Sequence, residues 1–215
     1  MLVKDRMSKP VIFVQAEMPI LEALKLMQRE KIRRAPVTRE GKMIGIVSDK
    51  DILNASPSDA TTLSMWELNY LMSRIKVQDI MTRDVRTVDE NTPIEEAARI
   101  MADNKIGGLP VMREGRVVGL ITETDLFRIL LELMGAREDG LRITAVVPDR
   151  VGELAAITQA MADCGASFVA FGQYSGDDTE TRTVAFKVIG IDEETARKQL
   201  EPMVERITDV RVTRQ

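Results

Sequence analysis

The chain has 215 residues, a formal net charge of −4 and no histidine. The negative charge gives no net attraction to a phosphate backbone, which argues against a nucleic-acid-binding protein. Histidine is the usual general base near neutral pH and the commonest metal ligand, so Ser-His, Cys-His and His-zinc chemistries are excluded. The single cysteine, Cys164, excludes a disulfide framework within the chain and a multi-cysteine zinc site.

Nothing in the sequence predicts a membrane or secreted protein. No run approaches the roughly 20 apolar residues of a membrane-spanning helix. The N-terminus is charged from Lys4 onward and lacks the apolar segment of a secretory signal. We therefore expect a cytoplasmic protein without membrane association.

Two segments of the chain are copies of one another. A shift of 74 positions aligns residues 3–53, the first copy, with residues 77–127, the second copy, without a gap, and 19 of the 51 aligned residues are identical. Such self-similarity indicates a duplicated structural unit.

The first copy predicts a β-α-β-β-α order. A short strand over Val11–Val14 precedes a helix that Pro19 opens, with apolar residues at helical spacing. Strands are expected from Pro36 and over Met43–Val47, separated by a turn. The last helix begins near Asp51, and the second copy repeats the pattern.

Residues 54–76 do not repeat. Large apolar residues between Leu63 and Ile75 predict an amphipathic helix that connects the copies. A polar linker over 136–140 follows the second copy. The remaining elements read as strand, helix, two strands, helix and strand, which is the order of a ferredoxin-like unit.

The duplicated unit resembles a CBS domain. The family's closing motif stands in the first copy as Gly45-Ile46-Val47-Ser48-Asp49-Lys50-Asp51 and in the second as Gly119-Leu120-Ile121-Thr122-Glu123-Thr124-Asp125. Two CBS domains in tandem form a Bateman module, and the resemblance implies that adenine nucleotides or related adenosyl ligands bind in clefts between the copies.

The residues of the motif suit a nucleoside. A carboxylate at a helix start accepts hydrogen bonds from both ribose hydroxyls, and a neighbouring Ser or Thr adds a polar contact. Apolar residues of both copies can enclose the base. The alternative is structural, with Ser48 and Thr122 as helix N-caps and the two aspartates in the first turn. The expected nucleotide-binding residues are Ser48, Asp51, Thr122, Asp125, Arg33, Arg34, Lys50, Val11, Val85, Ile32, Ile106 and Gly107.

The two copies differ where a phosphate would lie. Arg33, Arg34 and Lys50 of the first copy align with Gly107, Gly108 and Thr124 of the second. Arginine binds phosphate bidentately and lysine supplies a point charge, so the first copy is equipped for an anionic ligand. The two glycines permit close backbone approach or unusual dihedral angles, which would suit a base edge or an uncharged adenosyl group. The cationic residues are equally explained as solvated surface charges.

The segment Val147–Leu154 resembles the first strand-to-helix loop of an ACT domain. That resemblance implies an amino acid or other small metabolite bound at this loop, or a domain that only dimerises. The expected ligand-binding residues there are Asp149, Arg150, Val151, Gly152, Glu153 and Leu154.

The whole chain therefore predicts an α+β protein with two tandem CBS-like repeats packed as one module and a ferredoxin-like ACT domain. The order is similar to that of acetoin-utilisation AcuB-type regulatory proteins. The expected domains are a first repeat over 1–60, a connecting helix over 61–76, a second repeat over 77–135, a linker over 136–140 and an ACT-like domain over 141–215.

The expected function is that of a non-catalytic regulator, a homodimer that acts on a further, unidentified protein. Its regulatory ligand would be AMP, ADP or ATP, with S-adenosylmethionine as another possibility and no catalytic cofactor. A ligand-independent scaffold is the first alternative. An enzyme that uses carboxylates such as Asp51 and Asp125 is a remote one, because no nucleophile, base and oxyanion donors come together in the sequence.

Overall fold

The structure is a computed structural model that describes residues 1–55, 70, 72–176 and 179–214. It contains two compact units, residues 1–126 and residues 127–215. The predicted connecting helix falls for its greater part on residues 56–69 and 71, outside the described residues.

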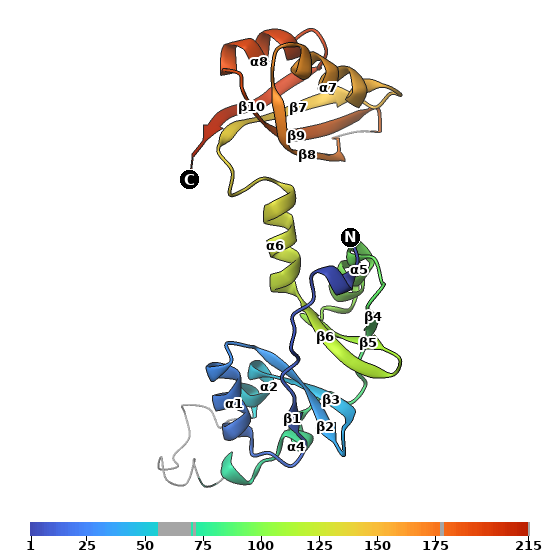
Figure 1. Cartoon of the computed structure of the whole chain (residues 1–215), viewed down its shortest axis with the longest axis vertical. Helices are drawn as coiled ribbons and strands as arrows, with labels where there is room; N and C mark the ends of the chain where they lie inside the picture. The colour runs from blue at the N-terminus through green and yellow to red at the C-terminus, as the bar shows by residue number, and fades with distance from the viewer. Residues whose placement is uncertain (56–69, 71, 177–178, 215) are drawn as a thin grey trace. The chain divides into compact units, whose positions relative to one another are not determined.

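The first unit repeats one arrangement twice (Figure 1). Each copy has a three-stranded sheet in which the first strand is parallel to the second and the second antiparallel to the third. The elements of the first copy are η1 (Val3–Asp5), β1 (Val14–Gln15), α1 (Ile20–Arg29), β2 (Arg34–Arg39), β3 (Lys42–Ser48) and α2 (Asp49–Asn54). Those of the second are α4 (Val77–Ile80), β4 (Val88–Asp89), α5 (Ile94–Asn104), β5 (Gly108–Arg113), β6 (Arg116–Thr122) and α6 (Glu123–Leu133). Only the first four residues of α6 belong to the first unit.

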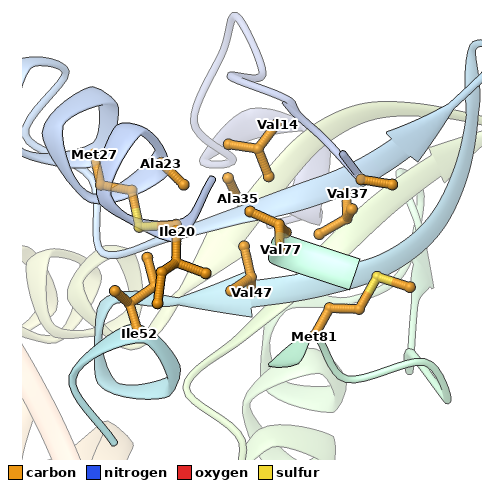
Figure 2. Packing of buried hydrophobic residues seen from close by; sticks show 11 residues of the cluster. Val14, Ile20, Ala23, Met27, Ala35, Val37, Val47, Ile52, Val77 and Met81 are labelled. Atoms are coloured by element: carbon orange, nitrogen blue, oxygen red, sulfur yellow. The ribbon is translucent and has the colours of Figure 1, made fainter. Parts of the chain in front are cut away.

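The opening segment of each copy packs in the hydrophobic core of the other copy. Val77 and Met81 are buried in the cluster formed by the first copy, as Figure 2 shows. Val3 and Met7 are buried in the cluster of the second copy. The two copies are therefore interlocked, and neither has a complete core of its own.

Short backbone bridges fix this exchange. Ile46 of β3 exchanges two N–H···O=C hydrogen bonds of 2.9 Å with Thr82, and Ser8 pairs in the same way with Leu120 of β6. A Cβ atom at Gly45 would lie 2.9 Å from the carbonyl oxygen of Thr82. Glycine at this position is thus needed for the close approach of the incoming segment.

The predicted strand over Val11–Val14 is wrong in its extent. β1 contains only Val14 and Gln15, and Phe13 is exposed. The reason is the exchange of segments: residue 8 pairs with β6 of the second copy, whereas Val14 pairs with Val37 of the first. Because the chain passes from one sheet to the other between these points, it cannot pair along its length with either.

The second unit has the predicted β-α-β-β-α-β order. Its elements are β7 (Gly140–Pro148), α7 (Glu153–Asp163), β8 (Ser167–Ser175), β9 (Thr181–Ile189), α8 (Glu193–Leu200) and β10 (Arg206–Thr213). The strands form an antiparallel sheet in the order β10-β7-β9-β8, and the ferredoxin-like topology is confirmed. Residues of both helices pack with alternate residues of β7 and β9 in one core, so the helices cover the same face (Figure 1).

Candidate functional site

The motif of the first copy is a closed hydrogen-bonded turn at the start of α2. The Ser48 N–H and Oγ–H both donate to Asp51 Oδ2 at 2.7 Å, and the Asp51 N–H donates to Ser48 Oγ at 3.2 Å. Ser48 is therefore the N-cap that the sequence predicts. Asp51 Oδ1 takes no part in these bonds, so the capping role leaves one carboxylate oxygen for a further partner.

The second copy has the same turn at the start of α6. The Thr122 N–H and Oγ1–H donate to Asp125 Oδ2 at 2.9 and 2.7 Å. Asp125 is buried, with 6% of its surface exposed, whereas Asp51 is only half-buried. The two motifs are thus alike in hydrogen bonding and unequal in solvent access.

A cavity of about 510 Å³ lies beside the first of these turns. Its wall joins the two copies: Ser48 and Asp51 come from the first, and Val85, Ile106 and Gly107 come from the second. The full lining, which we call cleft 1, consists of Arg34, Ile46, Val47, Ser48, Asp51, Thr82, Asp84, Val85, Arg86, Asn104, Lys105, Ile106, Gly107 and Gly108. Six of the twelve predicted nucleotide-binding residues are therefore brought together here.

Arg34 is the most enclosed cation of cleft 1. It begins β2, where its backbone pairs with Ser48, and its Nη1 donates to the carbonyl oxygen of Gly107. Burial lowers the pKa of the Arg34 guanidinium from its ordinary value, while the nearby Glu123 carboxylate raises it. A partly desolvated guanidinium of this kind is a strong partner for an anion that enters the cleft.

The other six predicted residues do not line cleft 1. Arg33 belongs to the first copy, but its Nη2 donates to Thr124 Oγ1 of the second copy at 2.7 Å. Lys50 is exposed. The prediction that Arg33, Arg34 and Lys50 of the first copy act together at one site is therefore not met, because Arg34 alone of the three lines cleft 1. The residues outside the lining are Val11, Ile32, Arg33, Lys50, Thr122 and Asp125.

Two further cations line cleft 1, Arg86 and Lys105, and neither was predicted from the sequence. Arg86 has no counterpart in the first copy, where Ile12 occupies the aligned position. Lys105 caps the C-terminus of α5 with φ of 54°, and Lys31 has the same φ at the end of α1. A lysine retained in both copies at a left-handed position, where glycine is the usual residue, was the available signal.

The loop expected to bind a ligand in the second unit surrounds a smaller cavity of about 310 Å³. Five of the six predicted residues line it, and Val151, which is fully exposed, does not. Gly152 precedes α7 with φ of 90°, and a Cβ there would meet no atom within 4 Å. Backbone conformation, and not close packing, therefore explains this glycine.

The two acids of this loop have different surroundings. Asp149 accepts hydrogen bonds from Arg182 at 2.7–2.8 Å, so its charge is paired. Glu153 is buried, and its Oε2 accepts from Arg150 Nε at 2.5 Å. Glu153 Oε1 has no hydrogen-bond partner among the described residues. A buried oxygen in this state is rare and calls for an explanation.

No group of three or more His, Cys, Asp or Glu side chains within residues 1–55, 70, 72–176 and 179–214 is placed to hold a metal ion. No helix in those same ranges has the length and apolar character needed to cross a membrane.

Comparison with known families identifies the two copies of the first unit. The CBS domain family matches residues 3–58 and again residues 77–132. The chain therefore belongs to the CBS domain family, as a tandem pair. Both matches end before residue 141, so the resemblance of residues 141–215 to an ACT domain stays a prediction.

Individual relatives each match about three fifths of the chain. A CBS domain-containing protein of Dictyostelium discoideum is 31% identical over 135 residues, which are 62% of this chain and 93% of that protein. The solved CBS domain pair of protein MJ0100, in complex with 5′-methylthioadenosine and S-adenosyl-L-methionine, is 32% identical with a TM-score of 0.52 and covers 64% of this chain and 98% of its own. A proposed acetoin utilization protein (AcuB) from Vibrio cholerae is 29% identical, with a TM-score of 0.52 and coverage of 64% and 96%.

Proposed function

We propose that this protein is a non-catalytic regulator whose cleft 1 binds an adenine nucleotide or a related adenosyl ligand. The observation that supports this most is the composition of one cavity: Asp51, whose Oδ1 takes no part in the Ser48 turn, apolar Val85 and Ile106, and the cation Arg34. A volume of about 510 Å³ falls within the roughly 300–1,000 Å³ of small-molecule sites.

Each part of the ligand has a chemically suited partner. Asp51 Oδ1 accepts from a ribose hydroxyl while Oδ2 stays bound to the Ser48 turn, which holds the carboxylate in place. Val85 and Ile106 enclose the base. Arg34, Arg86 and Lys105 outnumber the two acids of the lining, Asp51 and Asp84, so an anionic group is favoured. The related CBS pair in complex with two adenosyl compounds supports the same ligand class.

The first test is ligand-dependent thermal stability. AMP, ADP, ATP and S-adenosylmethionine are titrated separately, because a ligand that binds only the native state at about 100 times its Kd adds roughly 2.7 kcal/mol. We expect at least one of them to raise the melting temperature. No response to any of the four would favour the ligand-independent scaffold.

A second test uses Asp51. Asp51→Ala should weaken binding of the active ligand by about 1–3 kcal/mol, since a charged acceptor for the ribose is lost. Asp51→Asn keeps an acceptor for the Ser48 turn and separates ligand contact from helix capping. Asp103→Ala, at an exposed position of α5, is the matched control. Equal affinity in Asp51→Ala and the control would remove Asp51 from the site.

A second candidate site is the loop of the second unit. We propose that it binds an amino acid, with the ammonium group at Glu153 Oε1, the buried oxygen that has no hydrogen-bond partner within the described part of the chain. A panel of L-amino acids should include one that stabilises the wild type and has no effect on Glu153→Gln, while the exposed Glu194→Gln responds like wild type. If no amino acid stabilises the wild type, dimerisation remains as the role of this unit, and sedimentation equilibrium tests the homodimer expected from both resemblances.

A further inference from the structure

Arg34 crosses from one copy to the other. Its backbone lies in β2 of the first copy, but its side chain lies over the Gly107–Gly108 backbone of the second. A Cβ atom at Gly107 would lie 2.9 Å from Arg34 Cζ, and one at Gly108 would lie 3.0 Å from Arg34 Cδ. Neither glycine has a positive φ, so their role is to leave room for this arginine.

The first residue of α6 meets Arg34 at the same place. The Glu123 N–H donates to the Gly107 carbonyl oxygen at 3.2 Å, and that oxygen also accepts from the Arg34 guanidinium. The Cβ position at Gly107 is only 2.9 Å from Glu123 Oε2. Arg34, the Gly107 carbonyl and the start of α6 thus form one cluster.

The charges around Arg34 come from both motifs. Glu123 belongs to the second copy, and Asp49 and Asp51 belong to the first; all three favour the charged guanidinium, while the neighbouring Arg33 opposes it. An anionic ligand in cleft 1 would compete with these carboxylates for the same half-buried cation. When the ligand's anionic group binds the Arg34 guanidinium, the electrostatic attraction between Arg34 and Glu123 is therefore weakened.

The competition for Arg34 acts on a helix, α6, that belongs to both compact units. It runs from Glu123 to Leu133, and the limit between the two compact units falls inside it, between residues 126 and 127. Its first turn therefore belongs to the module that contains cleft 1, and its remainder belongs to the second unit.

We infer that Arg34 and Glu123 form a charge-selective link through which an anionic group in cleft 1 releases the first turn of α6. The link rests on the proposed function, that cleft 1 binds an adenosyl ligand, and adds which ligands act and which element responds. An uncharged adenosyl ligand fills the cleft without drawing Arg34 away. By reciprocity, whatever stabilises the Arg34–Glu123 pair weakens the charged ligand alone.

Calorimetric titration with AMP and with uncharged 5′-methylthioadenosine tests the link. Arg34→Gln should weaken the affinity for AMP about tenfold or more and leave the affinity for 5′-methylthioadenosine within about twofold of wild type. Glu123→Gln should raise the affinity for AMP by about threefold or more, because the Glu123 carboxylate no longer competes with the phosphate for Arg34. Arg99→Gln and Glu95→Gln, at two exposed positions of α5, are the matched controls.

The double variant separates the link from simple repulsion between Glu123 and phosphate. If Glu123 acts through Arg34, adding Glu123→Gln to Arg34→Gln changes AMP affinity by less than about twofold. Tightening that persists in the double variant overturns the link, as does an unchanged ratio of the two affinities in Glu123→Gln. If the wild type binds neither compound, the proposed function fails, and the ligand-driven release fails with it.

Amide hydrogen exchange measures the response of α6. AMP should speed exchange at residues 123–127 in the wild type but not in Arg34→Gln, and 5′-methylthioadenosine should not speed it in either. Without any ligand, Arg34→Gln should already exchange faster there than Arg99→Gln. Equal rates in these two ligand-free variants would show that Arg34 does not hold α6, whatever binds in the cleft.

Discussion

Val77 offers a direct test of the interlocked cores. Its sequence position belongs to the second copy, yet its side chain is fully buried among residues of the first (Figure 2). Val77→Ala removes two carbon atoms, or roughly 1.6 kcal/mol at about 0.8 kcal/mol for each buried group. The cavity that remains raises the total to about 2–3 kcal/mol. At roughly 2–8 °C per kcal/mol, the melting temperature of the first unit should fall by at least about 4 °C.

Urea denaturation followed by circular dichroism gives the loss of stability, and amide hydrogen exchange gives its location. We expect faster exchange in β2 and β3 of the first copy, where Val77 packs, before any change in β5 and β6. Val151→Ala is the control of the same residue type, because Val151 is fully exposed. Faster exchange confined to β5 and β6, or a loss no larger than that of the control, would refute the exchange of segments.

Three further outcomes follow from single contacts. Gly45→Ala should cost about 1–3 kcal/mol in urea denaturation, because its Cβ would press on the Thr82 backbone; a neutral result would mean that the bridge to Ile46 yields. Lys187→Met should destabilise the second unit by about 1–3 kcal/mol in thermal unfolding, because the buried amine donates to the Gly135 and Glu138 carbonyls at 2.7 and 2.8 Å; an unchanged melting temperature would contradict this. The hydrogen bond from the Thr195 N–H holds the pKa of Asp192 in the folded protein below its ordinary value of 3.8. The ionised Asp192 carboxylate therefore stabilises the fold above pH 3.8, and this stabilisation is lost as the pH falls through the lowered pKa. Asp192→Ser, a cap that does not titrate, should therefore lose less stability than wild type in melts below pH 3.8, and identical pH profiles would contradict the assignment.

Much of the fold could be predicted because each copy confirms the pattern of the other. Pro19 and Pro93 open equivalent helices, and the strands that follow are correctly placed. Apolar periodicity shows which face of an element is buried, but it does not show which sheet covers that face. For that reason Val3 and Val77 were recognisable as equivalent residues, whereas their exchange between copies was not predictable.

Half of the residues predicted for the site come together in cleft 1, and the other half do not. Ser48 and Asp51 are three positions apart in the sequence, so their contact follows from local helix capping. Arg34 is one of the predicted residues and lines cleft 1, but its hydrogen-bond partner is the Gly107 carbonyl of the other copy. Single-copy reasoning could not pair these residues, because the contact depends on how two sheets of separate copies face each other.

The missing half of each core also determines how the protein behaves when the chain is cut. A break between residues 55 and 70 would leave one fragment without Val77 and Met81 and the other without Val3 and Met7. Each fragment alone would expose an apolar gap shaped for the opening segment of its counterpart. Neither piece should therefore fold alone, and the two should assemble when they are mixed. The CBS pair could then serve as a split reporter, in which folding reports that two separate fragments have come together.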